Sequence, residues 1–204
     1  QNKGLGPADA ILLASDLVNS SLSECNMRGN KFDIESAKSL AKVGKEKGIM
    51  LFGIKRGQKE ADFQNQALGL LDAIFITSDL GISSLSECNV RGNNLDIESA
   101  QMLAKIGTEK RIALFGIKRD QKVADFQNKG LGPVDAILIA SDLVHGGLTE
   151  LNLDNNALGD SGIAAIQAVQ SDEQSKLATL IISSNRVGPV GANSVAAMVA
   201  AHLV

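Results

Sequence analysis

One stretch constrains the fold more than any other part of the chain: residues 148–158, which read Leu-Thr-Glu-Leu-Asn-Leu-Asp-Asn-Asn-Ala-Leu. Leu151 and Leu153 alternate with polar residues, and this period of two places the leucines on one face of a short strand. Asn156 follows where the chain must leave the strand, and its amide can hydrogen-bond backbone groups that would otherwise be buried without partners.

A helix is predicted to follow this strand. Gly159-Asp160-Ser161-Gly162 is predicted to form a loop, and the Ala/Ile/Val-rich run 163–170 is typical of a helix. The same succession of strand, loop and helix returns at 177–199. A unit of this kind cannot bury its apolar face alone, so it stacks on copies of itself.

These two copies read L-T-E-L-N-L-D-N-N-A-L-G-D-S-G-I-A-A-I-Q-A-V at 148–169 and L-A-T-L-I-I-S-S-N-R-V-G-P-V-G-A-N-S-V-A-A-M-V at 177–199. They resemble the leucine-rich repeat family, in its ribonuclease-inhibitor-like subtype with long repeats and outer helices. The resemblance implies an α/β fold: a horseshoe-shaped leucine-rich repeat solenoid with a parallel inner β-sheet and outer α-helices. We expect residues 1–204 to form a single such domain.

Upstream, the chain is a tandem duplication of residues 21–83 and 84–146, spaced by 63 residues, with more regular repeats over 147–204. The motif D-I-E-S-A recurs at 33 and 96, and each aspartate is a plausible helix N-cap. We expect second helices at about 70–80 and 134–143, and a last helix at 192–203. The expected core residues of that last helix are Val195, Met198, Val199 and Leu203.

Each duplicated unit contains two strand-like segments, at 49–54 and 59–64 in the first copy. They lie too close in sequence to be parallel neighbours, because a parallel crossover needs roughly a dozen residues or more. The register favours 49–54 as the strand of the main sheet, with 59–64 as an irregular extension. The alternatives are a hairpin around 55–58, or 59–64 in the sheet.

The composition argues against two classes of function, nucleic-acid binding and membrane insertion. The net charge is −3 and aromatic residues make up only 3%, without Trp or Tyr, which argues against nucleic acid as a partner. Membrane insertion is not expected, because no stretch approaches ~18 uncharged apolar residues. Cys25 and Cys88 occupy equivalent positions, and two stacked units separate them by ~10 Å, which is too far for a disulfide. We therefore expect two buried thiols in place of leucines, in a cytoplasmic protein.

Polar residues of the strands form the candidate binding surface, because equivalent positions line up in rows on the concave face when repeats stack. The predicted residues are Glu24, Asn26, Arg28, Asp62, Gln64, Glu87, Asn89, Arg91, Asp125, Gln127, Glu150, Asn152 and Asp154, joined by Glu60 if its segment lies in the sheet. Such an acidic, amide-rich face fits a protein partner with basic groups. The alternative is a solvated face whose Glu and Arg side chains pair across the sheet.

Nothing in the sequence indicates catalysis. No His accompanies the carboxylates, and Gly188–Gly191 lacks the signature of a phosphate-binding loop. Neither His145 nor His202 has a Ser or Cys partner at a suggestive spacing, so we predict no enzyme, no metal and no cofactor. The basic pairs Lys55-Arg56 and Lys118-Arg119 are interpreted as solvated turns.

The favoured function is a protein–protein interaction module or scaffold within a larger protein or assembly. The resemblance also implies a second candidate, a regulator that activates a GTPase or inhibits an enzyme. A third candidate is a structural subunit that packs end to end, because neither end of the repeat array carries an evident polar cap.

Overall fold

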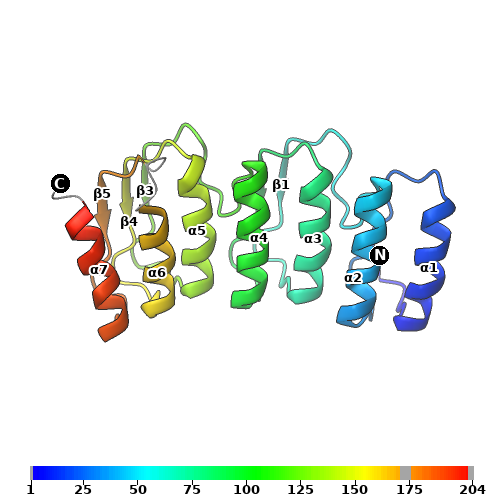
Figure 1. Ribbon diagram of the computed structural model, residues 1–204, viewed down its shortest axis with the longest axis horizontal. Coiled ribbons are helices and arrows are strands. Elements are labelled where there is room, and N and C mark those ends of the chain that lie inside the picture. Colours follow the sequence, from blue (N-terminus) through cyan, green and yellow to red (C-terminus); the bar gives the residue numbers. More distant parts are fainter. Residues whose placement is uncertain (1, 171–175, 202–204) are drawn as a thin grey trace.

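The computed structural model describes residues 2–170 and 176–201. Within them lie the helices α1 (Pro7–Asn19), α2 (Ile34–Lys47), α3 (Leu70–Ile82), α4 (Ile97–Lys110), α5 (Pro133–His145), α6 (Gly159–Gln170) and α7 (Pro189–Ala201), and the strands β1 (Glu60–Asp62), β2 (Glu87–Asn89), β3 (Val123–Asp125), β4 (Glu150–Asn152) and β5 (Thr179–Ile181). The helices stand side by side in one row, in chain order, and the strands form a second layer behind them (Figure 1). Helices alternating with short parallel strands fit an α/β repeat fold.

The predicted helix starts at Asp33 and Asp96 are confirmed. Each aspartate is extended, and its carboxylate accepts a hydrogen bond at 2.8 Å from the backbone N–H three residues on, that of Ser36 or Ser99. These bonds satisfy one of the donors that the first turn of a helix leaves without a partner.

The strand layer is parallel and interrupted. β1 pairs with β2, and β3, β4 and β5 form a separate sheet. Two single parallel bridges lie outside these strands: Glu87 with Ala113 extends the β1–β2 ladder, and Glu24 with Met50 is a separate pairing. Because all these pairings are parallel, the connecting helices run in the same direction and cover one side of the layer. The carboxyl ends of the helices therefore lie along one edge of the molecule.

The preference for 49–54 as the main strand is wrong. The strand of this unit is β1, at 60–62, which pairs forward with β2. The segment at 49–51 instead pairs backward: the N–H of Met50 donates to the carbonyl of Ser23 at 2.9 Å. The two segments therefore face different neighbours, and the layer is interrupted between them. The hairpin alternative is also wrong, since the described strand pairings do not join these segments.

Glycine at position 107 of α4 has a packing reason. A Cβ there would lie 2.7 Å from Leu114 Cδ1 and 3.1 Å from the carbonyl oxygen of Ile112. The absence of a side chain at Gly107 therefore lets the segment that contains Ile112 and Leu114 pack closely against α4. Gly44 of α2 has the same relation to Leu51, with a virtual Cβ 2.6 Å from Leu51 Cδ1.

We expect Gly107→Ala to destabilise the protein by about 1–3 kcal/mol, because the added methyl overpacks the contact with Leu114. This loss outweighs the ~1 kcal/mol that alanine ordinarily gains over glycine inside a helix. Urea unfolding measures the effect. The control is Gly81→Ala in α3, where a Cβ meets only Lys45 Cε at 3.8 Å, and which should be neutral or slightly stabilising. Equal stabilisation by both substitutions would contradict the close approach.

The core runs between the two layers. α3 and α5 are buried on most sides, and each packs between two neighbouring helices. On α1 the pattern differs: Ile11 and Leu12 are 74% and 67% exposed, whereas the equivalent Ile74 and Phe75 of α3 are 6% and 3% exposed.

Two details of the predicted core need correction. Cys25 is half-buried, although Cys88 is buried as expected, and both thiols are free. In α7, Met198 is buried and Val195 packs against the core, but Val199 is 55% exposed because it lies on the outer side of the helix. Leu203 lies outside the described residues.

Candidate interaction surface on the strands

Strand pairing brings several predicted residues together on β1 and β2. Glu60 lies opposite Glu87, and Asp62 lies opposite Asn89. Adjacent strands are ~4.8 Å apart, so these side chains are neighbours. Glu60 and Asp62 are exposed, and Glu87 and Asn89 are half-buried. Asn89 Nδ2 donates a hydrogen bond to Gln64 Oε1 at 3.2 Å. We call these five residues the acidic strand patch.

Glu24, Glu87 and Glu150 occupy equivalent strand positions, but they do not form a continuous row. Glu24 lies opposite Met50, and Glu87 meets Ala113 on the side away from β1. Glu150 lies opposite Val123. The row is broken because the backward-pairing segments at 49–51 and 113 lie within the duplicated units, beside the segments that carry Glu24 and Glu87.

A second set of predicted residues meets on β3 and β4. Asp125 lies opposite Asn152, and Gln127 Nε2 donates to Asp154 Oδ2 at 3.0 Å. The other carboxylate oxygen of Asp154 is buried without a hydrogen bond among the described residues. This second set repeats the carboxylate and amide chemistry of the acidic strand patch, with fewer carboxylates side by side.

The middle row of the surface also has a structural role. Asn26, Asp62, Asn89, Asp125 and Asn152 each accept a hydrogen bond at 3.0–3.1 Å from the backbone N–H two residues on. Such local bonds fix the chain where it leaves a strand. Substitutions in this row would therefore disturb the strand ends as well as any bound partner.

The predicted surface residues Arg28 and Arg91 do not form ion pairs with the glutamates. The guanidinium carbon of Arg28 lies 4.6 Å from the ring centroid of Phe52 and 5.5 Å from that of Phe63. The two rings meet edge to face with centroids 5.1 Å apart. The equivalent group contains Arg91, Phe115 and Phe126. The ion pairs of the described residues lie on α2 instead, so the alternative of Glu–Arg pairing across the sheet is wrong.

Two buried aspartates have a structural role that was not predicted from the sequence. The carboxylate of Asp79, in α3, accepts the backbone N–H groups of Leu51 and Phe52, both at 2.8 Å. Asp142, in α5, binds the equivalent groups of the next unit at 2.6 and 2.9 Å. Burial raises the pKa of Asp79 to about 6 and that of Asp142 to about 7, although the N–H donors act in the opposite direction. The available signal was Ser-Asp-Leu repeated inside two apolar helices.

These raised pKa values predict a pH dependence of stability. The ordinary value is 3.8, so the folded state holds more protons than the unfolded state between about pH 4 and pH 7. The free energy of unfolding is therefore expected to fall as pH rises, by up to about 1.4 kcal/mol per pH unit for each group, from about pH 4 to pH 6 for Asp79 and from about pH 4 to pH 7 for Asp142. Urea unfolding from pH 5 to pH 7 measures the slope. Asp142→Asn removes one titration and should flatten it, and an unchanged slope would contradict the assignment.

The predicted role of Asn156 is confirmed. Its Oδ1 accepts the backbone N–H groups of Lys129 and Leu131 at 3.1 and 3.0 Å, and its Nδ2 donates to the carbonyls of Phe126 and Leu153 at 2.9 and 2.8 Å. One amide thus joins two neighbouring repeats. The asparagines at equivalent positions, which also bind backbone groups of a neighbouring repeat, are Asn30, Asn93 and Asn185.

The other candidate chemistry has little structural support. Nε2 of His145 lies 3.0 Å from the carbonyl oxygen of Thr108, a contact that fastens α5 to α4. Over the described ranges, no group of three or more His, Cys, Asp or Glu side chains is arranged to hold a metal ion. None of the described helices is both long and apolar enough to cross a membrane.

Comparison with known protein families finds a match in the C-terminal part of the chain. Residues 148–166, which contain β4 and part of α6, match a family model described as Leucine Rich repeat. No curated protein matches the chain. Leucine-rich repeats commonly mediate protein–protein interaction and are typically non-enzymatic modules. The family match, together with the alternation of helices and short parallel strands, supports a leucine-rich repeat protein.

Proposed function

We propose that this chain is a protein–protein interaction module of the ribonuclease-inhibitor-like leucine-rich repeat type, which binds its partner on the strand side of the molecule. The observation that supports this most is the acidic strand patch. There, two exposed carboxylates lie beside a half-buried one on neighbouring strands. The helices cover the opposite side of the strands, so the patch is presented to solvent (Figure 1).

Charge defines the partner. Three carboxylates gather within the acidic strand patch, and the nearby Arg28 and Arg91 lie over phenylalanine rings rather than in ion pairs with them. A partner that presents Lys or Arg side chains would complement this field, which speeds association and selects against acidic proteins. A GTPase-activating or enzyme-inhibiting regulator would use the same side, so the same substitutions test both.

The test is affinity capture from an extract of the source cells, with bound proteins identified by mass spectrometry. The strand-side variant carries Glu24→Lys, Glu60→Lys and Glu150→Lys, all at exposed positions. Proteins that bind the wild-type chain through this side are expected to be lost in the variant. Circular dichroism and thermal unfolding confirm that the variant remains folded.

A matched control carries the same change of charge on the helices, with Glu35→Lys, Glu98→Lys and Glu109→Lys, also exposed. It should retain the partners of the wild-type chain. Partners retained equally by both variants would overturn binding on the strand side. Self-association of the wild-type chain without other partners would favour the structural subunit.

A further inference from the structure

Positive charge is concentrated in two short segments of this acidic chain. Segment 45–59 holds Lys45, Lys47, Lys55, Arg56 and Lys59 against one acidic residue, a net charge of +4. We call these five cations the first basic cluster. Segment 108–122 carries five cations against two carboxylates, a net charge of +3. Since the whole chain has a net charge of −3, the other residues together carry −10.

The second basic cluster consists of Lys110, Arg111, Lys118, Arg119 and Lys122. All ten cations of the two clusters are exposed. In each cluster, some cations lie at the carboxyl end of a helix, α2 or α4, and the others lie in the loop that follows that helix.

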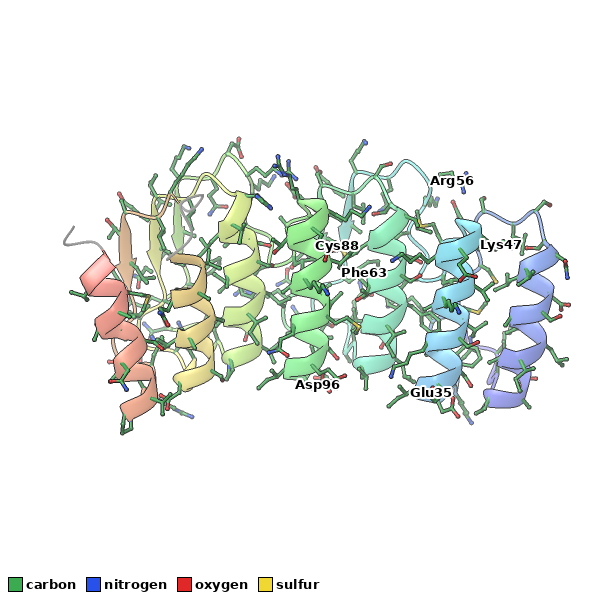
Figure 2. All side chains as sticks on the ribbon, viewed as in Figure 1. Glu35, Lys47, Arg56, Phe63, Cys88 and Asp96 are labelled. Atoms are coloured by element: carbon green, nitrogen blue, oxygen red, sulfur yellow. The ribbon has the colours of Figure 1, made fainter. Side chains whose placement is uncertain are left out.

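Hydrogen bonds hold each loop against its helix end. Nη2 of Arg56 donates to the carbonyl of Gly48 at 2.8 Å, just beyond α2. Arg119 donates in the same way to the carbonyl of Arg111 at the end of α4. The helices run in one direction, so both clusters lie along the same edge. In Figure 2, Lys47 and Arg56 lie toward the upper edge, opposite Glu35 and Asp96 at the lower edge.

The distance between the clusters follows from helix packing. α2 and α4 are separated by α3, which packs against both. Neighbouring helix axes are ~8–10 Å apart, so the clusters lie ~16–20 Å apart. A bound segment that reaches both would gain affinity from the linkage of two contacts.

Helix electrostatics explains only part of this arrangement. Cations near a helix carboxyl end offset its dipole, which accounts for Lys47 and Lys110. Lys55, Lys59 and Lys118 lie beyond the helices, and within the described residues no ion pair engages them. These loops add positive charge to an edge where the helix dipoles are already offset.

We propose that this basic edge binds an acidic protein segment with two groups of carboxylates ~20 Å apart. Nucleic acid fits less well: none of the six Phe residues is exposed, and the chain has no Trp or Tyr, so no ring is available for base stacking. A continuous polyanion or an anionic membrane would also face the −10 charge of the remaining residues. A short segment with two separate acidic groups avoids that repulsion. This edge and its acidic partner differ in charge from the strand side and its basic partner, and the two surfaces meet where the backbone N–H of Arg56 donates to Glu24 Oε1 at 3.2 Å.

The probe is a synthetic fluorescent peptide with two blocks of glutamates joined by a neutral spacer of about six residues, which spans ~20 Å when extended. The edge variant carries Lys47→Gln, Lys55→Gln, Lys110→Gln and Lys118→Gln, and it spares the arginines that bind backbone carbonyls. We expect its affinity for the peptide, measured by fluorescence anisotropy, to be at least ~10-fold lower than that of the wild-type chain. Added salt should weaken wild-type binding.

The matched control carries Lys3→Gln, Lys31→Gln, Lys38→Gln and Lys129→Gln, the same loss of charge at exposed positions outside both clusters. It should bind within ~2-fold of the wild-type chain. An equal loss in both variants, or no binding of the peptide by the wild-type chain, would overturn the proposal. So would tighter binding of single-stranded DNA or phosphatidylserine vesicles in the same buffer. Equal affinity for a peptide with all its glutamates in one block would overturn the two-group arrangement.

Discussion

Replacement of Asp142 by alanine is expected to lower the free energy of unfolding by about 3–5 kcal/mol. The carboxylate accepts hydrogen bonds from the backbone N–H groups of Leu114 and Phe115, which are both buried. Alanine leaves both donors without an acceptor, at about 1–3 kcal/mol each, and it also leaves a void. Urea unfolding at pH 6 measures the loss as a lower midpoint, with the slope of the transition unchanged.

The chain supplies its own control for this prediction. Asp16 of α1 is the equivalent residue, because Asp16, Asp79 and Asp142 follow one another at intervals of 63, but it is exposed. Asp79→Ala should cost about as much as Asp142→Ala, whereas Asp16→Ala should change stability by no more than ~0.5 kcal/mol. Equally small effects at all three positions would mean that other contacts hold the segments beginning at 49 and 112.

Features that depend on local sequence were predictable. The alternation at 151–153 requires only a strand with one buried face, and Leu151 and Leu153 are indeed buried. The N-caps at Asp33 and Asp96 likewise depend on a carboxylate and the first turn that follows it. Asn156 was identifiable because its place in the motif fixes which backbone groups it can reach.

Features decided by contacts distant in sequence were not predictable. Whether 49–54 or 59–64 pairs forward depends on Asp79, which holds the backbone of Leu51 and Phe52 from a later helix. It also depends on Gly44, which leaves room for the Leu51 side chain. The spacing of the strand motif along the chain gives no information about either of these contacts.

The candidate site shares this limit. The residues of the acidic strand patch were identifiable by their place in the strand motif. Whether Glu24 would have a glutamate neighbour depended on the backward pairing of Met50, which interrupts the row. Arg28 was assigned to the surface only from its position in the strand motif. Its packing over Phe52 and Phe63 could not be predicted, because it depends on the folded structure.

Replacement of Asn93 by alanine is expected to lower the free energy of unfolding by about 2–4 kcal/mol. Its Oδ1 accepts the backbone N–H groups of Gln66 and Leu68 at 2.9 and 3.0 Å, and its Nδ2 donates to the carbonyls of Phe63 and Val90 at 2.9 and 2.7 Å. Alanine removes all four bonds at the junction of two repeats. The side chain is half-buried, so water replaces some of them, which keeps the loss below the sum of four unsatisfied groups.

Two further variants isolate this role in urea unfolding. Asn94→Ala changes the exposed neighbour and should leave stability within ~0.5 kcal/mol of the wild-type chain. Asn93→Asp keeps the Oδ1 acceptor but loses the Nδ2 donor, and its charge would lie opposite the carbonyls of Phe63 and Val90. Its free energy of unfolding at pH 7 should therefore be no higher than that of Asn93→Ala. It should rise again on acidification, because the protonated carboxyl can donate a hydrogen bond. If Asn93→Asp matched the wild-type stability at pH 7, the donated hydrogen bonds would not hold the two repeats together.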